Sequence, residues 1–199
     1  MKKIVIASKN EGKIKEIKNF LHGLDIEILT LNDFPDVPEI SEDGRTFEEN
    51  AMKKAKTVFE HSKLTTLADD SGLEVRYIGD EPGVHSARFS GDNANDRQNN
   101  EKLLDLLKDV QMDDRRARFK CVLVLYNSLY NNIVFEGICE GYVIDEPKGE
   151  LGFGYDPLFV PDGFTKTFGE LDLVTKNKIS HRGKALNSLR GYVEKMLTV

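Results

Sequence analysis

Cysteine is scarce in this sequence, since only Cys121 and Cys139 occur among 199 residues. Each lies in a strand-like run, so we expect buried thiols rather than the disulfide framework of a small secreted protein. No Cys/His spacing of the kind that binds zinc occurs either. The sequence therefore gives no indication of a disulfide scaffold or of a Cys/His metal centre.

Long apolar runs and an excess of positive charge are also missing. No stretch approaches the roughly 18 apolar residues that a membrane helix needs, and the apolar run that follows the first lysines ends at Lys9, too early for a signal peptide. The 28 basic and 34 acidic residues give a net charge of −6. This balance disfavours a general nucleic-acid binder, although a local basic patch can still hold phosphates. We therefore expect a cytoplasmic protein without membrane or nucleic-acid partners.

No internal repeat, low-complexity tract or flexible linker interrupts the chain. Its length fits one large domain or two small lobes with a proper hydrophobic core.

The first segment reads as strand, polar turn and helix. Ile4 to Ala7 is a continuous apolar run, which is typical of a strand buried on both faces. The turn Ser8–Lys13 follows, and apolar residues then recur at helical spacing. Such a turn gathers backbone N–H groups, the positive helix end and Lys13 around an anion such as phosphate, although it lacks the Walker A pattern. The alternative is an N-cap by Ser8 or Asn10, with Lys13 in solvent.

A second helix is expected from Thr46 to about Ser62. Thr46 and Glu49 have the spacing of a capping box, and the apolar face comprises Phe47, Ala51, Ala55 and Val58. At 100° per residue, Asn50 and Lys54 fall on the shoulder of that face, whereas Lys53 points away. Lys54 is therefore a better ligand candidate than Lys53.

Two adjacent carboxylates, Asp69 and Asp70, follow a short apolar strand that ends near Leu67. We expect Gly72 to form a turn and Leu73–Ile78 to form another strand. Neighbouring carboxylates raise each other's pKa unless a cation offsets them, and oxygen-only ligands favour Mg²⁺. The alternative is a solvated turn. Neighbours on a strand face opposite sides, which would leave one catalytic and one supporting carboxylate.

The second half contains a leucine-rich helix at about 95–108, with a packing face of Leu103, Leu104, Leu106 and Leu107. One strand is expected at 115–126 and one or two more at 133–144, joined to it as an antiparallel hairpin across 127–132. A Thr167/Glu170 pair repeats the capping-box spacing ahead of Leu171 and Leu173. An amphipathic helix is expected after the basic residues at 176–184, with Leu186, Leu189, Val193, Met196 and Leu197 on its apolar face.

Two later segments carry candidate ligand residues. In the loop Gly152–Pro157, glycines let the backbone approach a ligand, Phe153 or Tyr155 can stack on a base, and Asp156 can accept from donor groups. The alternative is a plain hairpin loop. Five basic side chains then crowd residues 176–184, which reads either as a solvated face or as a contact to a carbonyl or phosphate.

Six motifs in order make the chain resemble the inosine triphosphate pyrophosphatase family, also called Ham1-like. They are Ser8-x-Asn10-x-x-Lys13, Thr46-Phe47-x-Glu49-Asn50-Ala51, Ala68-Asp69-Asp70-Ser71-Gly72-Leu73, Pro82-Gly83-Val84-x-Ser86-Ala87-Arg88, Gly152-Phe153-Gly154-Tyr155-Asp156-Pro157 and Ser180-His181-Arg182. The resemblance implies a single domain over residues 1–199. Its fold would be a two-lobed α/β fold around a long twisted mixed sheet with flanking helices, an active-site cleft between the lobes, and a homodimer as the assembly. One departure is His85, where the family usually has a tyrosine.

The resemblance also implies an activity: Mg²⁺-dependent hydrolysis of ITP, dITP and XTP to the monophosphate and pyrophosphate. Asp70 would be the general base and a metal ligand, with Glu42 as the second metal ligand. The implied substrate residues are Ser8, Lys9, Asn10, Glu11, Gly12, Lys13, Lys54, Ser71, Phe153, Gly154, Tyr155, Asp156, Lys176, His181 and Arg182. A Maf-like nucleotide pyrophosphatase and a nucleotide-binding sensor without turnover are the alternatives.

Overall fold

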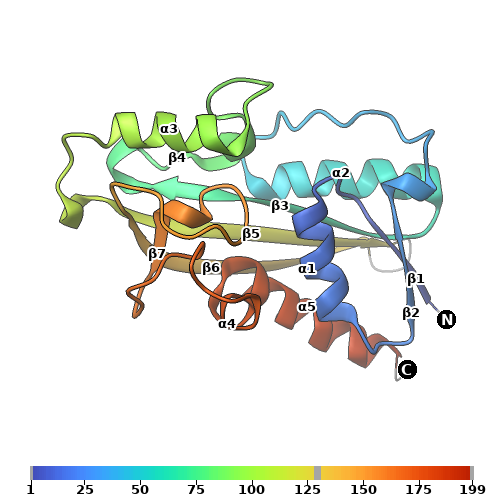
Figure 1. Cartoon of the computed structure of the whole chain (residues 1–199). Coiled ribbons are helices and arrows are strands. Elements are labelled where there is room, and N and C mark those ends of the chain that lie inside the picture. Colours follow the sequence, from blue (N-terminus) through green and yellow to red (C-terminus); the bar gives the residue numbers. More distant parts are fainter. Residues whose placement is uncertain (1, 128–130, 198–199) are drawn as a thin grey trace. The chain divides into compact units, whose positions relative to one another are not determined.

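The structure is a computed structural model that describes residues 2–127 and 131–197. Its central element is a mixed β-sheet. Within these residues the sheet has seven strands in the order β2-β1-β3-β5-β6-β7, with β4 paired to β3. The strands are β1 (Lys2–Ile6), β2 (Ile26–Thr30), β3 (Thr65–Val75), β4 (Glu81–Pro82), β5 (Arg116–Asn127), β6 (Asn131–Val143) and β7 (Phe159–Pro161). The helices are α1 (Glu11–Leu21), α2 (Phe47–Ser62), α3 (Asp96–Leu106), α4 (Leu173–Ile179) and α5 (His181–Leu197) (Figure 1).

Parallel and antiparallel pairs occur in the same sheet. β1 pairs in parallel with both β2 and β3, whereas β3–β4 and β6–β7 are antiparallel. The predicted mixed α/β architecture with flanking helices is therefore confirmed. None of the helices in the described residues is long and apolar enough to cross a membrane.

The chain divides into two compact units. Unit 1 comprises Met1–Asp70, Cys121–Glu136 and Lys184–Val199, and unit 2 comprises Ser71–Lys120 and Gly137–Gly183. The boundary in β3 thus falls directly after the two adjacent carboxylates.

Helices cover both faces of the strands of unit 1. On one face, a hydrophobic cluster contains side chains of α1 and α5 together with side chains from β1, β3 and β5. The strand residues in it include Ile4, Ile6 and Leu67. Figure 1 shows α2 on the other side of the strands from α5. This arrangement follows from right-handed crossover connections. The chain crosses the sheet in one direction from β1 to β2 and in the opposite direction from β2, past β1, to β3. The two connecting helices, α1 and α2, therefore lie on opposite faces of the strands. Asp69 shares a strand face with Leu67, and Asp70 shares one with Ala68.

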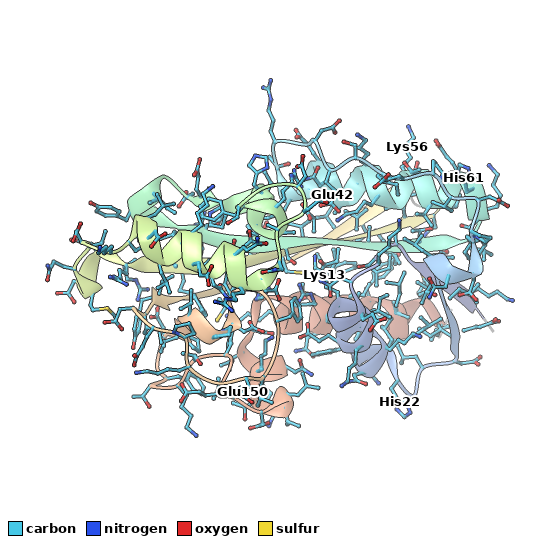
Figure 2. All side chains as sticks on the ribbon, turned by 45° about the horizontal axis from the view of Figure 1, so that its top comes forward. Lys13, His22, Glu42, Lys56, His61 and Glu150 are labelled. Carbon is cyan, nitrogen blue, oxygen red and sulfur yellow. The ribbon has the colours of Figure 1, made fainter. Side chains whose placement is uncertain are left out.

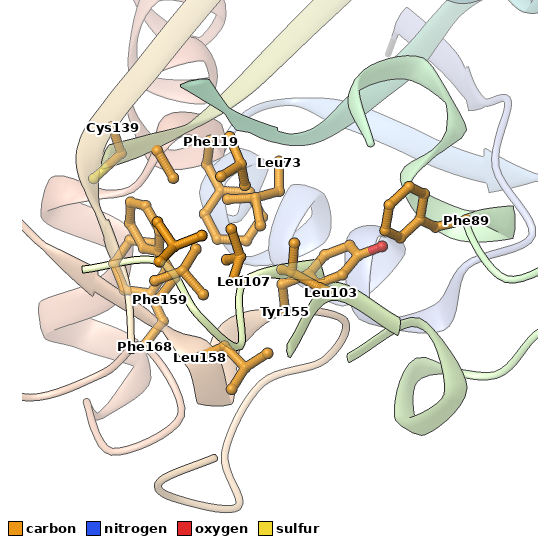
Figure 3. Close-up of a cluster of buried hydrophobic side chains, with 14 of the residues drawn as sticks. Leu73, Phe89, Leu103, Leu107, Phe119, Cys139, Tyr155, Leu158, Phe159 and Phe168 are labelled. Carbon is orange, nitrogen blue, oxygen red and sulfur yellow. The ribbon is translucent and has the colours of Figure 1, made fainter. Parts of the chain in front are cut away.

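Unit 2 has its own aromatic core. Phe119 of β5 stacks on Phe168 and packs edge-on against Phe159, with ring centroids 5.9 and 4.8 Å apart. Leu103 of α3 and Leu107, which directly follows that helix, belong to the same cluster (Figure 3). The predicted packing face of this helix is wrong at one position, because the Leu106 side chain is exposed.

The strand β3 runs without a break through the two carboxylates and Gly72, so the predicted turn at Gly72 is wrong. A Cβ atom at position 72 would lie 2.3 Å from Ser86 Oγ and 2.5 Å from the carbonyl oxygen of Gly83. Gly72 is therefore needed for a close approach of two segments rather than for a turn. The predicted strand Leu73–Ile78 is instead the end of β3 followed by a 3₁₀ turn, Arg76–Ile78.

Two further predictions concern segment ends. Thr167 and Glu170 do hydrogen-bond to each other, but α4 begins later and is capped by Asp172. A capping pair that is not followed by helical backbone therefore closes a turn only. β5 and β6 are neighbours in the sheet, while residues 128–130 of the predicted hairpin loop lie outside the described residues.

Candidate active site

The turn before α1 is organised by Asn10. Its side chain is the N-cap and accepts a hydrogen bond from the Lys13 backbone N–H at 3.0 Å, while Ser8 Oγ accepts one from the Asn10 N–H at 3.2 Å. Lys9, Asn10 and Glu11 are exposed, and Ser8 is partly buried. The predicted N-cap is therefore present, and it leaves the turn accessible at a positive helix end.

Lys13 does not extend into solvent, contrary to the alternative that accompanied the N-cap. Its ammonium group forms an ion pair with the Asp69 carboxylate, whose side chain is fully buried. The Cys121 thiol donates to the other Asp69 oxygen at 3.2 Å. Asp69 therefore acts as a supporting group that holds Lys13 at the start of α1.

Asp70 belongs to a second charge cluster, on the opposite face of β3. Lys54 of α2 donates to Asp70 Oδ1 at 3.3 Å and to Glu42 Oε1 at 2.8 Å. Figure 2 shows Glu42 on the loop before α2 and Lys13 on α1. Asp70 and Lys54 are 5% and 7% exposed, so this ion pair is shielded from water. The cluster unites three of the predicted site residues, Glu42, Lys54 and Asp70.

One ammonium group serves two carboxylates in this cluster. Burial is the main factor that raises the pKa of Asp70, aided by the Glu42 and Asp69 charges, and it outweighs the effect of Lys54 and Lys13. Burial opposes the charge on Lys54, but the Asp70 and Glu42 carboxylates outweigh it and raise the pKa of the ammonium group. A raised pKa brings a carboxylate closer to the pH at which a general base works best.

The Glu42–Asp70 pair fits a hard divalent cation. Asp70 Oδ2 is buried and has no hydrogen-bond partner within residues 2–127 and 131–197. An unpartnered buried oxygen is costly unless a ligand satisfies it. In the described part of the chain, no three His, Cys, Asp or Glu side chains form a ready-made metal cage. Two carboxylates nevertheless suit Mg²⁺, which keeps several waters and takes its remaining ligands from substrate phosphates.

Unit 2 holds a separate set of buried polar residues. Lys176 Nζ lies 2.6 Å from Asp156 Oδ2, and both side chains are 4% exposed. Asp156 Oδ2 also accepts a hydrogen bond from the Phe153 backbone N–H at 2.8 Å. Lys176, His181 and Arg182 of the basic run are buried, whereas Lys178 and Lys184 are exposed. Only part of the run is therefore a solvated face.

Arg182 and His181 lie at the start of α5. Arg182 donates to Ser71 Oγ at 2.7 Å, and the His181 ring stacks on Phe119 with centroids 4.6 Å apart. The Phe153 ring has two cations near it, with Lys176 Nζ 5.1 Å and the Arg182 guanidinium carbon 5.5 Å from its centroid. Unit 2 thus brings five predicted site residues together: Phe153, Asp156, Lys176, Arg182 and Ser71.

The two aromatic rings of the glycine loop have different environments. The Tyr155 ring is buried in the core of unit 2 (Figure 3), and its hydroxyl donates to the Ser86 carbonyl oxygen at 2.9 Å. Phe153 is only partly buried. Of the two rings, Phe153 is therefore the one placed to stack on a base.

Sequence reasoning missed the residues that hold the glycine loop in place. Asp96 accepts a hydrogen bond from the Gly154 N–H at 2.6 Å, and the Asn100 side chain donates to the Gly154 carbonyl oxygen at 3.0 Å. Both come from the first turns of α3, more than 50 residues before the loop. Of the residues that contact this loop, Ser86 belongs to one of the six motifs, whereas no local pattern identified Asp96 or Asn100.

Comparison with known proteins bears on the whole chain. A sequence model of the Ham1 family matches residues 4–192. The chain is 47% identical over 193 residues to a dITP/XTP pyrophosphatase of Geobacter sulfurreducens, covering 97% of each chain. It resembles a solved HAM1 protein from Coxiella burnetii, with a TM-score of 0.90 and 40% identity over 98% of this chain and 100% of that one. A Ham1 protein of Staphylococcus aureus gives a TM-score of 0.89 with the same identity and coverage.

These matches agree with the six motifs in extent and in order. The family match begins in β1, before the first charge cluster, and ends in α5, after the buried basic residues. Both sets of site residues therefore fall inside it. On these grounds the chain belongs to the Ham1 family.

Proposed function

We propose that this protein hydrolyses non-canonical purine nucleoside triphosphates, namely ITP, dITP and XTP, to the monophosphate and pyrophosphate. The observation that carries the proposal is the Glu42–Lys54–Asp70 cluster, in which Lys54 and Asp70 are buried and the pKa of Asp70 is raised. One Asp70 oxygen has no hydrogen-bond partner in the described residues. The names of close relatives support the substrate class, since these proteins are called dITP/XTP pyrophosphatases.

The residues of unit 1 supply the phosphate chemistry. The exposed turn Ser8–Lys13 binds the triphosphate through backbone N–H groups, and Lys13 and Lys54 stabilise the charge that develops on the phosphate oxygens and on the leaving pyrophosphate. Asp70 accepts the proton of the attacking water. Glu42 and Asp70 would hold Mg²⁺, which would supply positive charge to offset the triphosphate and a lowered pKa for the attacking water.

The residues of unit 2 recognise the purine and its sugar-phosphate. Phe153 stacks on the base, the Gly154 and Tyr155 backbone lines its edge, and Ser71 contacts the substrate. The predominantly donor groups Lys176, His181 and Arg182 suit the 6-oxo acceptor of hypoxanthine and xanthine. Adenine has an amine there, which such donors would leave unpaired at a cost of about 1–3 kcal/mol.

We further propose that residues 1–199 work as one Ham1-like domain, because the family match extends over nearly all of them. By family resemblance the protein is a homodimer with Mg²⁺ as its cofactor. We also propose a cytoplasmic location, where a nucleotide pool would supply these substrates, and no nucleic-acid or membrane partner. A Maf-like enzyme is not favoured, because the chain's family match is to Ham1 proteins.

One assay tests the reaction and its base together. Purified protein with Mg²⁺ is given ITP, dITP, XTP, ATP and GTP, and pyrophosphate and orthophosphate are measured separately. Pyrophosphate should be the direct product from the first three. Asp70→Asn should lower turnover by at least about 100-fold while ITP binding survives. Orthophosphate as the direct product would refute α–β cleavage, and binding without turnover by the wild type would favour a sensor.

A further inference from the structure

We propose that Asn50 is a positioning residue whose buried side chain fixes the loop carrying Glu42 and thereby sets the Glu42 carboxylate for a divalent cation. The inference rests on the proposed function, because it takes Glu42 as a metal ligand. Asn50 itself touches neither of the two carboxylates in the contacts described above. It acts through the backbone of the loop.

The loop before α2 is held along its length by the first turns of that helix. Glu42 pairs with Lys54 at 2.8 Å, and Asp43 pairs with Lys53 at 2.7 Å. The Gly44 N–H donates to Asn50 Oδ1 at 2.7 Å, and the Arg45 N–H donates to Glu49 Oε2 at 2.6 Å. Four successive loop residues therefore each contact a different side chain of α2, and we call this set of contacts the loop clasp.

Burial distinguishes the Asn50 contact from its neighbours. Asn50 has no exposed area, whereas the Lys53 and Asp43 side chains are 42% and 68% exposed. Arg45 and Glu49 are also exposed. Exposed ion pairs contribute little because water and salt screen them. Apart from the Glu42–Lys54 pair itself, the hydrogen bond from Gly44 to Asn50 is therefore the contact of the loop clasp that is best shielded from water, and it lies two residues from Glu42.

Gly44 lies directly against the helix at this point. A Cβ atom at position 44 would lie 2.7 Å from Asn50 Oδ1 and 2.9 Å from Glu49 Cβ. Residue 44 has no room for a side chain unless the loop moves away from α2. A substitution at Gly44 therefore disturbs the same contact from the opposite partner.

The neutrality of the Asn50 amide explains why the residue is not an aspartate. Its Nδ2 group is buried and has no hydrogen-bond partner among the residues that the structure describes, which is unfavourable. An aspartate would supply the same acceptor without this cost. It would, however, place a further buried negative charge one helical turn from Lys54, which already serves two carboxylates. The neutral amide supplies the acceptor without that charge.

The experiment measures cation binding apart from catalysis. Binding of Mn²⁺ alone to the full chain is titrated by electron paramagnetic resonance for the wild type, Asn50→Ala, Gly44→Ala, Glu42→Gln and Lys53→Ala. Changing a residue that orients a metal ligand typically weakens metal affinity about 10-fold or more. We expect such a loss in Asn50→Ala and Gly44→Ala, and a change below about twofold in the control Lys53→Ala, which removes only the exposed contact.

The outcomes separate this inference from the proposed function. If Glu42→Gln weakens Mn²⁺ binding and Asn50→Ala does not, the inference is wrong and the proposed metal site stands. If Glu42→Gln leaves Mn²⁺ binding unchanged, the assignment of Glu42 fails, and the inference fails with it. A lower melting temperature of Asn50→Ala with unchanged cation affinity would show a purely structural role. Where Mn²⁺ alone binds too weakly to titrate, the Mg²⁺ concentration for half-maximal ITP hydrolysis is compared, and an unchanged value in Asn50→Ala overturns the inference.

Discussion

Replacing Gly72 by alanine tests whether β3 is held by direct contact with the Pro82–Arg88 segment. The Ser86 hydroxyl accepts a hydrogen bond from the Leu73 N–H at 3.0 Å and donates one to the Gly83 carbonyl oxygen at 2.6 Å. A new Cβ at position 72 would lie inside the contact distance of both oxygens, at 2.3 and 2.5 Å. One of the two obstacles is backbone, so a simple rotation of the serine side chain cannot relieve the clash.

The magnitude follows from three contributions. Overpacking costs about 1–3 kcal/mol, and displacing Ser86 leaves the buried Leu73 N–H without its partner, which costs about 1–3 kcal/mol. In the opposite direction, alanine stabilises a strand by roughly 0.5–1 kcal/mol relative to glycine, because it lowers the conformational entropy of the unfolded chain. We expect a net loss of about 2–4 kcal/mol, which lowers the melting temperature of a chain of this size by roughly 5–12 °C.

Thermal and urea unfolding followed by circular dichroism provide the measurement. Gly191→Ala is the matched control, because a Cβ at this position in α5 meets no atom within 4 Å. This change should stabilise the protein by up to about 1 kcal/mol. If Gly72→Ala melts within about 2 °C of the wild type while the control behaves as expected, the close approach is refuted. The turn predicted from sequence at Gly72 would then regain support.

Three other predictions concern the buried charges. Lys176→Met leaves the Asp156 carboxylate buried without its ammonium partner and should cost about 3–5 kcal/mol in urea unfolding; a loss below about 1 kcal/mol would mean that water reaches this pair. Arg182→Ala should lower the ratio of kcat/KM for ITP over ATP by roughly 10- to 100-fold, and an unchanged ratio would place base recognition elsewhere. Burial raises the pKa of Asp70, so the Asp70 carboxyl stays protonated to higher pH in the folded protein than in the unfolded chain. The free energy of unfolding therefore falls as pH rises through the raised pKa. The melting temperature of Asp70→Asn should therefore rise relative to the wild type over that range, and a constant difference between the two proteins would contradict this assignment.

The charge clusters also show where stability and activity conflict. Asp70 is destabilising in its ionised form, and its second oxygen has no partner in the described residues. A chain selected for stability alone would replace it with a neutral or apolar side chain. Asp69, one residue earlier, is fully satisfied by Lys13 and Cys121. The two adjacent carboxylates therefore differ in their hydrogen-bond partners. Of the two, Asp70 is the one with an oxygen available to a proton or a cation.

Local pattern was sufficient for much of the fold. The apolar run in β1, the N-cap at Asn10 and the helical spacing in α2 depend on interactions within a few residues, which the sequence displays directly. The shoulder position of Asn50 and Lys54 was predicted from the same periodicity, and both are buried. Strand alternation also predicted that Asp69 and Asp70 face opposite sides, which their separate partners on α1 and α2 confirm.

By itself the sequence determined the family, the helix and strand periods, and the residue types of the candidate site, because six ordered motifs and short-range periodicity are visible in one dimension. Only the tertiary structure decided that Gly72 lies inside a strand, that Lys176, His181 and Arg182 of the basic run are buried, and that the Thr167–Glu170 pair starts no helix. The first two features depend on partners in other segments of the chain: Ser86 and Gly83 for Gly72, and Asp156 for Lys176. Burial and pairing between distant segments outweigh local preference wherever a charge or a close backbone contact must be accommodated.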